Sequence, residues 1–190
     1  MRVARFVGKL LAAGLVLPAL AAACSDPVRD TAIAALGEEN PNIPVGEYHR
    51  AGQPCVTCHT PSGPASNVPF SVAGSVFAIA GPAVGVENAF VAMTDTLGSS
   101  YVAHTNCVGN WYVTRSQWDP AFPIFVRVYK DGLSRTMQGQ IGRERSCANC
   151  HKDSRATSLA KYSSVGHVYL YTSAVPPPTN CPVNPVAGAK

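Results

Sequence analysis

Short runs of β-branched and aromatic residues, separated by turn-forming residues, recur along the chain from Phe70 onward. We expect strands in six of these runs, at residues 70–77, 89–94, 101–105, 110–114, 124–130 and 167–171. In the fifth run, Ile124, Val126 and Val128 alternate with Arg127 and Tyr129, which predicts a strand with one buried face. Several short strands at this spacing are typical of a mainly β, antiparallel sandwich.

The first 23 residues have the layout of a signal peptide. Residues 1–9 carry three cations and no acidic residue, and residues 10–23 carry no charge. These 14 uncharged residues fall short of the roughly 20 that a membrane-spanning helix needs. We therefore expect residues 1–23 to be an export signal that is removed, and residues 24–48 to be a tether with a short helix near residues 30–36.

Residues 20–25 resemble a bacterial lipobox, although Ala21 stands where Leu is usual. The resemblance implies that Cys24 becomes the lipid-bearing N-terminus, and that Ser25 after it directs the protein to the outer membrane. The chain would then be a lipoprotein of the periplasm, the outer membrane or the cell surface, anchored by its lipid. The alternative is ordinary signal cleavage after Ala23, which would leave Cys24 as an unpaired thiol.

Composition describes a folded chain without the charge of a nucleic-acid binder. Of the 190 residues, 46% are hydrophobic and 14% charged, so one globular domain is expected. The formal charge of +4 falls when the signal with Arg2, Arg5 and Lys9 is removed, which leaves 12 basic and 11 acidic residues. This balance predicts no nucleic-acid partner.

The middle of the chain resembles the carboxypeptidase regulatory-like, transthyretin-like sandwich. The resemblance is carried by residues 72–76, 88–91, 95–98 and 105–112, which include Asn88-Ala-Phe-Val91 and Asn110-Trp-Tyr112. It implies an immunoglobulin-like antiparallel sandwich for residues 70–131.

Two Cys-x-x-Cys-His sequences carry the candidate chemistry. The first motif is Cys55-Val-Thr-Cys58-His59, and the second motif is Cys147-Ala-Asn-Cys150-His151. This pattern is the attachment signature of c-type haem, in which both sulfurs of one turn reach the porphyrin edge and the adjacent His binds the iron. The chain thus resembles a dihaem c-type cytochrome. The resemblance implies two covalent haems, thioether bonds from the four cysteines, and His59 and His151 as proximal iron ligands. We expect one haem on each flank of the sandwich.

Two other readings of the paired cysteines remain open. Cys55, Cys58, Cys147 and Cys150 have the pairing of a four-Cys zinc site, although zinc does not require His after each pair. Thioredoxin-like thiol chemistry is the other reading, but it usually places Cys-x-x-Cys at the start of a helix in a βαβ unit.

The two remaining cysteines suggest a disulfide. Cys107 and Cys181 each follow Thr-Asn and would both meet an oxidising compartment after export. We expect a bridge that fixes the Pro-rich C-terminal tail to the sandwich, with two unrelated buried thiols as the alternative.

The sixth iron ligands have few candidates. For the first haem we expect His49, because Gly52 and Pro54 favour a turn that returns it toward His59. For the second haem the candidates are Met137 and His167, with Met137 favoured. Of the remaining two candidates, we expect Met93 to be a core residue and His104 to be a residue of the sandwich surface, although His104 remains a ligand candidate.

The sequence therefore predicts an exported dihaem cytochrome that transfers single electrons to and from other redox proteins at the cell envelope. A haem peroxidase or reductase, or a haem-based gas sensor, would instead leave one iron open. The expected segments are the signal (1–23), the tether (24–48), the first haem-binding segment (49–69), the sandwich (70–131), the second haem-binding segment (132–165), and a last strand with the tail (166–190).

Overall fold

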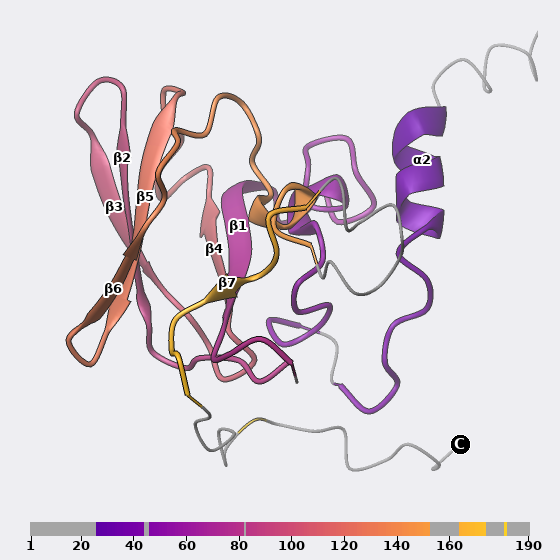
Figure 1. The fold of residues 1–190 in the computed structure, drawn as a ribbon. Helices are drawn as coiled ribbons and strands as arrows, with labels where there is room; N and C mark the ends of the chain where they lie inside the picture. The colour runs from indigo at the N-terminus through magenta and orange to yellow at the C-terminus, as the bar shows by residue number, and fades with distance from the viewer. Residues whose placement is uncertain (1–25, 44–45, 82, 153–163, 174–180, 182–190) are drawn as a thin grey trace, which may run out of the picture. The chain divides into compact units, whose positions relative to one another are not determined.

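A computed structural model describes residues 26–43, 46–81, 83–152, 164–173 and 181 of the chain (Figure 1). The chain divides into two compact units, Met1–Gly37 and Glu38–Lys190. The described part of the first unit contains helix α2 (Pro27–Ala34). Asp26 caps this helix by accepting a hydrogen bond from the Arg29 N–H at 3.0 Å, and Pro27 occupies its first turn. The expected short helix is present, but this cap starts it earlier than residue 30.

The second unit is mainly β and contains two sheets. The first has the order β4-β1-β7, and the second the order β3-β2-β5-β6 (Figure 1). Two short 3-10 turns, η1 (Cys55–Thr57) and η2 (Cys147–Asn149), lie outside the sheets. The strands are β1 (Phe70–Phe77), β2 (Phe90–Asp95), β3 (Ser100–His104), β4 (Asn110–Thr114), β5 (Ile124–Lys130), β6 (Leu133–Thr136) and β7 (Val168–Tyr169).

All six expected strands are present, and one further strand was missed. Strand β6 pairs with β5 and lies inside residues 132–165, which were assigned to the second haem-binding segment. Asp131 and Gly132 connect the two strands with φ angles of 51° and 78°. Asp-Gly with two positive φ angles is the usual turn of a two-residue hairpin, so the sequence did contain this signal. The sheet therefore extends beyond residue 131.

The expectation of a wholly antiparallel arrangement is wrong for one pair of strands. β7 runs parallel to β1, with Val76 opposite Val168 and Phe77 opposite Tyr169. The other strand pairs are antiparallel. A parallel neighbour requires a long connection between the two strands, and here residues 78–167 separate β1 from β7.

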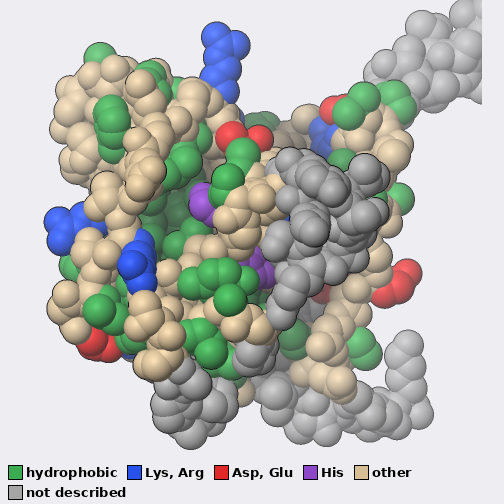
Figure 2. Space-filling view, viewed as in Figure 1, with side chains coloured by type: hydrophobic (Ala, Val, Ile, Leu, Met, Phe, Trp, Pro, Cys, Tyr) green, Lys and Arg blue, Asp and Glu red, His purple; other side chains and the backbone are tan. Residues whose placement is uncertain are grey.

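Buried residues of both sheets form one hydrophobic cluster. From the first sheet it includes Val72, Val76 and Trp111, and from the second Val91 and Val128. On the face drawn in Figure 2, hydrophobic side chains also line a hollow next to this cluster. Both sheets therefore share one interior.

Strand β1 is central to this arrangement because all eight of its residues are buried. Successive side chains of a strand point to opposite faces, so β1 contributes to two clusters. Val72 and Val76 belong to the cluster shared with the second sheet. Ala73 belongs to a smaller cluster with Val56 and Phe70. The second face of β1 is thus covered by the segment that contains the first motif.

The expected disulfide between Cys107 and Cys181 is present, with a Cα–Cα distance of 5.3 Å. Cys107 is buried in the turn between β3 and β4. Cys181 belongs to the C-terminal tail, so the bridge ties this part of the tail to the turn.

Several expectations concern residues outside the described ranges. The signal peptide (1–23) and the lipidation site Cys24 are among them. Of the helices that the structure does describe, none combines the length and the hydrophobicity required to cross a bilayer.

The disulfide should contribute strongly to stability, because it closes a loop with a sequence separation of 74. In the chain-entropy model such a bridge restricts the unfolded chain and stabilises the fold by about 4 kcal/mol. The Cys107→Ser/Cys181→Ser variant should therefore lose about this much free energy of unfolding, as measured by guanidinium denaturation of the exported protein. An unchanged midpoint and slope would contradict the prediction.

Candidate functional site

The two motifs fold into the same local structure. In the first motif, the N–H groups of Cys58 and His59 donate to the Cys55 carbonyl at 3.2 and 3.0 Å. In the second motif, the equivalent two bonds end on the Cys147 carbonyl at 3.2 and 2.8 Å. Each motif is therefore one tight turn that carries two cysteines and the histidine that follows them.

The histidines of both turns are oriented in the same way. His59 Nδ1 lies 2.8 Å from the carbonyl oxygen of Val68, and His151 Nδ1 lies 2.8 Å from that of Gly166. A carbonyl only accepts hydrogen bonds, so Nδ1 must carry the hydrogen in each pair. In the neutral ring this leaves a lone pair on Nε2, the atom that then binds a metal.

The surroundings of His59 favour its neutral form. Burial lowers its pKa below the ordinary value, and the nearby His49 lowers it further, although the hydrogen bond to the Val68 carbonyl acts in the opposite direction. A neutral imidazole is the form that binds metals.

Both turns are attached to β1. The Phe70 N–H donates to the His59 carbonyl at 3.0 Å, and the Ala73 N–H donates to the Arg145 carbonyl at 2.9 Å. Ala73 also forms a parallel bridge with Ser146, the residue before the second motif. Phe70 and Ala73 are three residues apart, or about 10 Å along a strand.

The two turns also contact each other directly. The Val56 N–H, in the first motif, donates to Ser146 Oγ at 2.8 Å, and this hydroxyl is buried. The segments that carry the two motifs are therefore in contact, whereas the expectation of one haem on each flank of the sandwich stays a prediction. The motifs are neighbours on one strand, because β1 and Ser146 bring together segments that are 90 residues apart in sequence.

Gly74 provides the space that the second motif needs beside β1. A Cβ atom at this position would lie 2.9 Å from Cys147 Cβ and 3.1 Å from Trp111 Cζ2. Glycine inside a strand often marks such a close approach, so its place in Val72-Ala-Gly-Ser-Val76 was a usable signal in the sequence.

The first thiol of each motif is held in its protonated form. Burial raises the pKa of Cys55 to about 11 and that of Cys147 to about 12. Reactive thiols in redox enzymes have lowered pKa values, because the thiolate is the attacking species. The surroundings of these two residues thus argue against thioredoxin-like chemistry.

The four cysteines of the motifs do not assemble into a zinc site. Among the described residues, which include both motifs completely, no three His, Cys, Asp or Glu side chains converge closely enough to hold a metal ion.

His49 lies beside the first motif, as its sequence position suggested. Its ring centre is 6.0 Å from that of His59, with an angle of 27° between the two planes. Its Nδ1 is bonded to the Gly46 carbonyl, so its Nε2 is also the nitrogen with a lone pair. Two imidazoles this close, each with a lone pair on Nε2, are the pair that could hold one metal ion at this motif.

The second motif borders a cavity of about 380 Å³. Cys147, Cys150 and His151 lie in its wall. Residues of both sheets complete the wall, and they include Val76, Val91, Trp111, Val126, Val128 and Val168. The volume falls within the range of about 300–1,000 Å³ typical of cofactor and ligand sites, and the walls are mostly apolar, as in such sites.

The lining of the cavity distinguishes the two candidates for the sixth ligand of the second site. Met137 follows β6 directly and lies in the cavity wall. His167 is not among the lining residues, and its ring stacks on Phe77 with centres 4.5 Å apart. A Cβ at Gly52, in the loop before the first motif, would lie 3.3 Å from His167 Nε2. Met137 is therefore the better placed of the two.

The charged residues near the second motif have different roles. Arg143 lies in the cavity wall together with Arg135 of β6, which sequence reasoning missed because β6 itself was missed. Arg145 is instead engaged with Asp119 at 2.9 Å and with the Ser71 carbonyl at 3.0 Å. Arg135 and Arg143 are thus the cations that an acidic group in the cavity would meet.

Two residues considered at the sequence level have the ordinary positions expected for them. Met93 is buried in the core between the sheets. His104 is exposed on β3, where its ring lies against Phe90 with centres 4.7 Å apart.

No protein-family model matches this chain, and neither does any curated protein or any solved structure. The site is accordingly interpreted from its own chemistry.

Gly74→Ala tests whether the second motif depends on close contact with β1. The added methyl group would collide with Cys147 and Trp111, and overpacking of this kind typically costs about 1–3 kcal/mol. Gly139→Ala is the matched control, because a Cβ at Gly139 would have open space around it and its φ angle is ordinary. Guanidinium unfolding should show a lower free energy of unfolding for Gly74→Ala and an unchanged one for Gly139→Ala. Equal free energies in the two variants would contradict the close contact.

Proposed function

We propose that this chain is an exported dihaem c-type cytochrome that transfers single electrons between redox proteins at the bacterial cell envelope. The observation that carries this proposal is the identical geometry of the two motifs. Each is one tight turn, and each presents a histidine whose Nδ1 is bound by a main-chain carbonyl and whose Nε2 is left with a lone pair.

The residues present fit the proposed cofactor in their donor set. Cys55 and Cys58 would hold the first haem by thioether bonds, with His59 as its proximal ligand. Cys147 and Cys150 would hold the second in the same way, with His151 as its proximal ligand. When bound, each haem supplies an iron that accepts and releases one electron between its ferric and ferrous forms. The chain fixes the orientation of the two histidines through the Val68 and Gly166 carbonyls.

The sixth ligands that we propose differ between the two sites. His49 serves the first site, because its ring is 6.0 Å from that of His59. Met137 serves the second, because it shares the cavity wall with His151. A methionine ligand raises the reduction potential relative to two histidines, so electrons would favour the second site. Arg135 and Arg143 would neutralise the acidic propionates there.

The finer assignments of fold and location belong to the same proposal. The two sheets with a shared interior support an immunoglobulin- or transthyretin-like sandwich that carries the haem segments. The lipobox-like sequence supports a lipid at Cys24 and attachment to the membrane through that lipid. Redox proteins of the envelope would be the partners.

The number of haems per chain tests the proposal. Protein exported through a bacterial periplasm with cytochrome maturation should give two covalent haems per chain by the pyridine haemochrome assay. Cys55→Ala/Cys58→Ala and Cys147→Ala/Cys150→Ala should each retain one. Stoichiometric zinc without haem, or reactive thiols without either, would overturn the proposal.

The proposed ligands can be tested one at a time. His49→Ala should make one low-spin haem high-spin and able to bind carbon monoxide, whereas His104→Ala, which removes a surface histidine, should not. Met137→Ala should abolish the far-red sulfur-to-iron band, and His167→Ala should leave it. Rapid carbon monoxide binding by the unaltered protein would instead favour a haem enzyme or a sensor with one open iron.

A further inference from the structure

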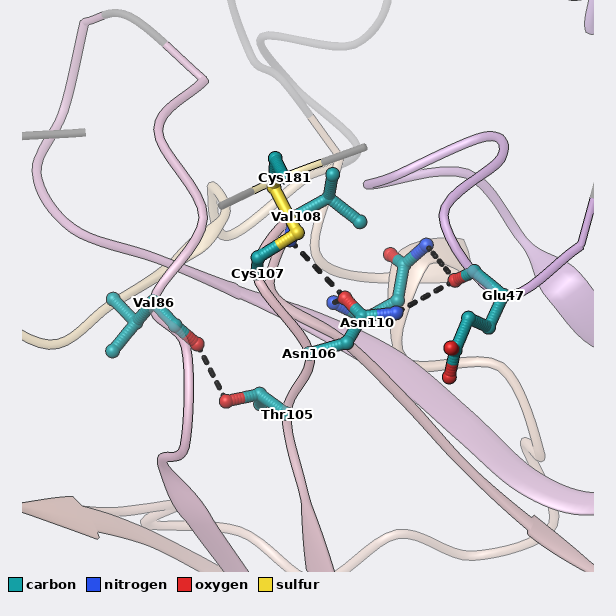
Figure 3. Close-up of a disulfide and its surroundings, with 8 residues drawn as sticks. All are labelled: Glu47, Val86, Thr105, Asn106, Cys107, Val108, Asn110 and Cys181. Atoms are coloured by element: carbon teal, nitrogen blue, oxygen red, sulfur yellow. Dashed lines mark hydrogen bonds between the residues drawn. A yellow bond between two sulfur atoms is a disulfide. The ribbon is translucent and has the colours of Figure 1, made fainter. Parts of the chain in front are cut away.

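The loop that carries His49 is held by one side chain from the turn between β3 and β4 and by one from the first residue of β4. Asn110 Nδ2 donates to the carbonyls of Glu47 and His49 at 3.2 and 3.0 Å. Asn106 Nδ2 donates to the same Glu47 carbonyl at 2.7 Å (Figure 3). Residues 46–52 lie outside the helices and strands, so these bonds fix a segment that has no ladder of its own.

The amide of Asn110 is itself fixed in orientation. Asn110 is 7% exposed, and its Oδ1 accepts a hydrogen bond from Ser75 Oγ at 2.7 Å. Ser75 Oγ in turn accepts the Gly52 N–H at 2.8 Å. An amide whose oxygen is occupied in this way must present its two N–H donors to the loop. The loop is thereby attached to β1 and β4 at both of its ends.

The turn before Asn110 is held by further bonds of its own. Asn106 Oδ1 accepts the N–H groups of Val108 and Asn110 at 3.2 and 3.0 Å. The disulfide of Cys107 and Cys181 lies in the same turn (Figure 3). The donors that hold Glu47 and His49 are thus supported by a covalent bridge and by local hydrogen bonds.

We infer that Asn110 is a positioning residue that holds His49 against the first haem site. This inference rests on the proposed function, since it gives His49 the role of sixth ligand. The amide binds the main chain of the ligand residue itself, and it thereby fixes the distance from which the imidazole approaches His59. We call the two hydrogen bonds from the Asn110 amide to the Glu47 and His49 carbonyls the clamp. Without the clamp, His49 is still present, but its imidazole can dissociate from the iron.

The experiment compares Asn110→Asp with the unaltered protein and with His49→Ala. Asp has the shape of Asn but replaces both N–H donors by an oxygen that faces two carbonyls. Carbon monoxide binding to the reduced protein, followed by stopped-flow absorbance, should be about tenfold faster or more in Asn110→Asp, because two buried hydrogen bonds are lost. His49→Ala should be faster still, and both haems should remain attached in each variant.

Thr105→Val is the matched control. Thr105 lies in the same turn and is buried, and its hydroxyl donates to the Val86 carbonyl (Figure 3). The same hydroxyl accepts the Ala89 N–H at 2.8 Å. It holds a different loop, so its loss should leave carbon monoxide binding slow. Equal rates in Asn110→Asp and the unaltered protein, or fast binding in Thr105→Val, would overturn the inference while the haem count still supports the proposed function.

A second variant, Ser75→Ala, tests the same contact from the side of β1. If Asn110→Asp cannot be recovered, Ser75→Ala releases the Gly52 N–H and the Asn110 amide from the opposite side and should also speed carbon monoxide binding. Slow binding in that variant would overturn the clamp. If His49→Ala does not open the first site, His49 is no ligand and the clamp fails with that assignment, whereas loss of both haems from every variant would overturn the proposed function itself.

Discussion

The burial of strand β1 on both faces is the constraint on which the candidate site depends. One face of β1 contributes to the interior shared by the two sheets, and the other packs against the first motif. One edge is paired with β4, and the other receives β7 and residues 145–146. A single strand therefore fixes both Cys-x-x-Cys-His turns, and the Ser146 hydroxyl joins them. In the proposed function, this contact joins the segments that would hold the two haems.

The two sites differ in their surroundings, although their turns are alike. The first has a second histidine, which a network of amides attaches to β1 and β4. The second opens on a mostly apolar cavity between the sheets, with a methionine and two arginines in its wall. Differences in ligand, burial and nearby charge are the means by which a protein sets haem potentials. In the proposed function, these differences would make electron transfer between the two haems directional.

Local patterns predicted most of the strands and the two motifs, because alternation, turn residues and Cys-x-x-Cys-His spacing act over a few residues. The disulfide could also be predicted, since Cys107 and Cys181 remained after the motif cysteines and Cys24 had been assigned. Contacts between segments far apart in the sequence could not be predicted from local patterns. Nothing near Ser146 in the sequence indicates a bond to Val56, and nothing near Asn110 indicates a bond to the His49 carbonyl. Strand β6 is a different case, because the Asp131-Gly132 turn was readable and was overlooked.

Anomalous diffraction at the iron absorption edge, from crystals of the exported protein, tests the central claim most directly. The account predicts two iron atoms per chain, one next to His59 Nε2 and one next to His151 Nε2, with both turns still joined through Val56 and Ser146. A single metal surrounded by the four motif cysteines, or two irons on opposite flanks of the sheets with the motifs apart, would contradict it.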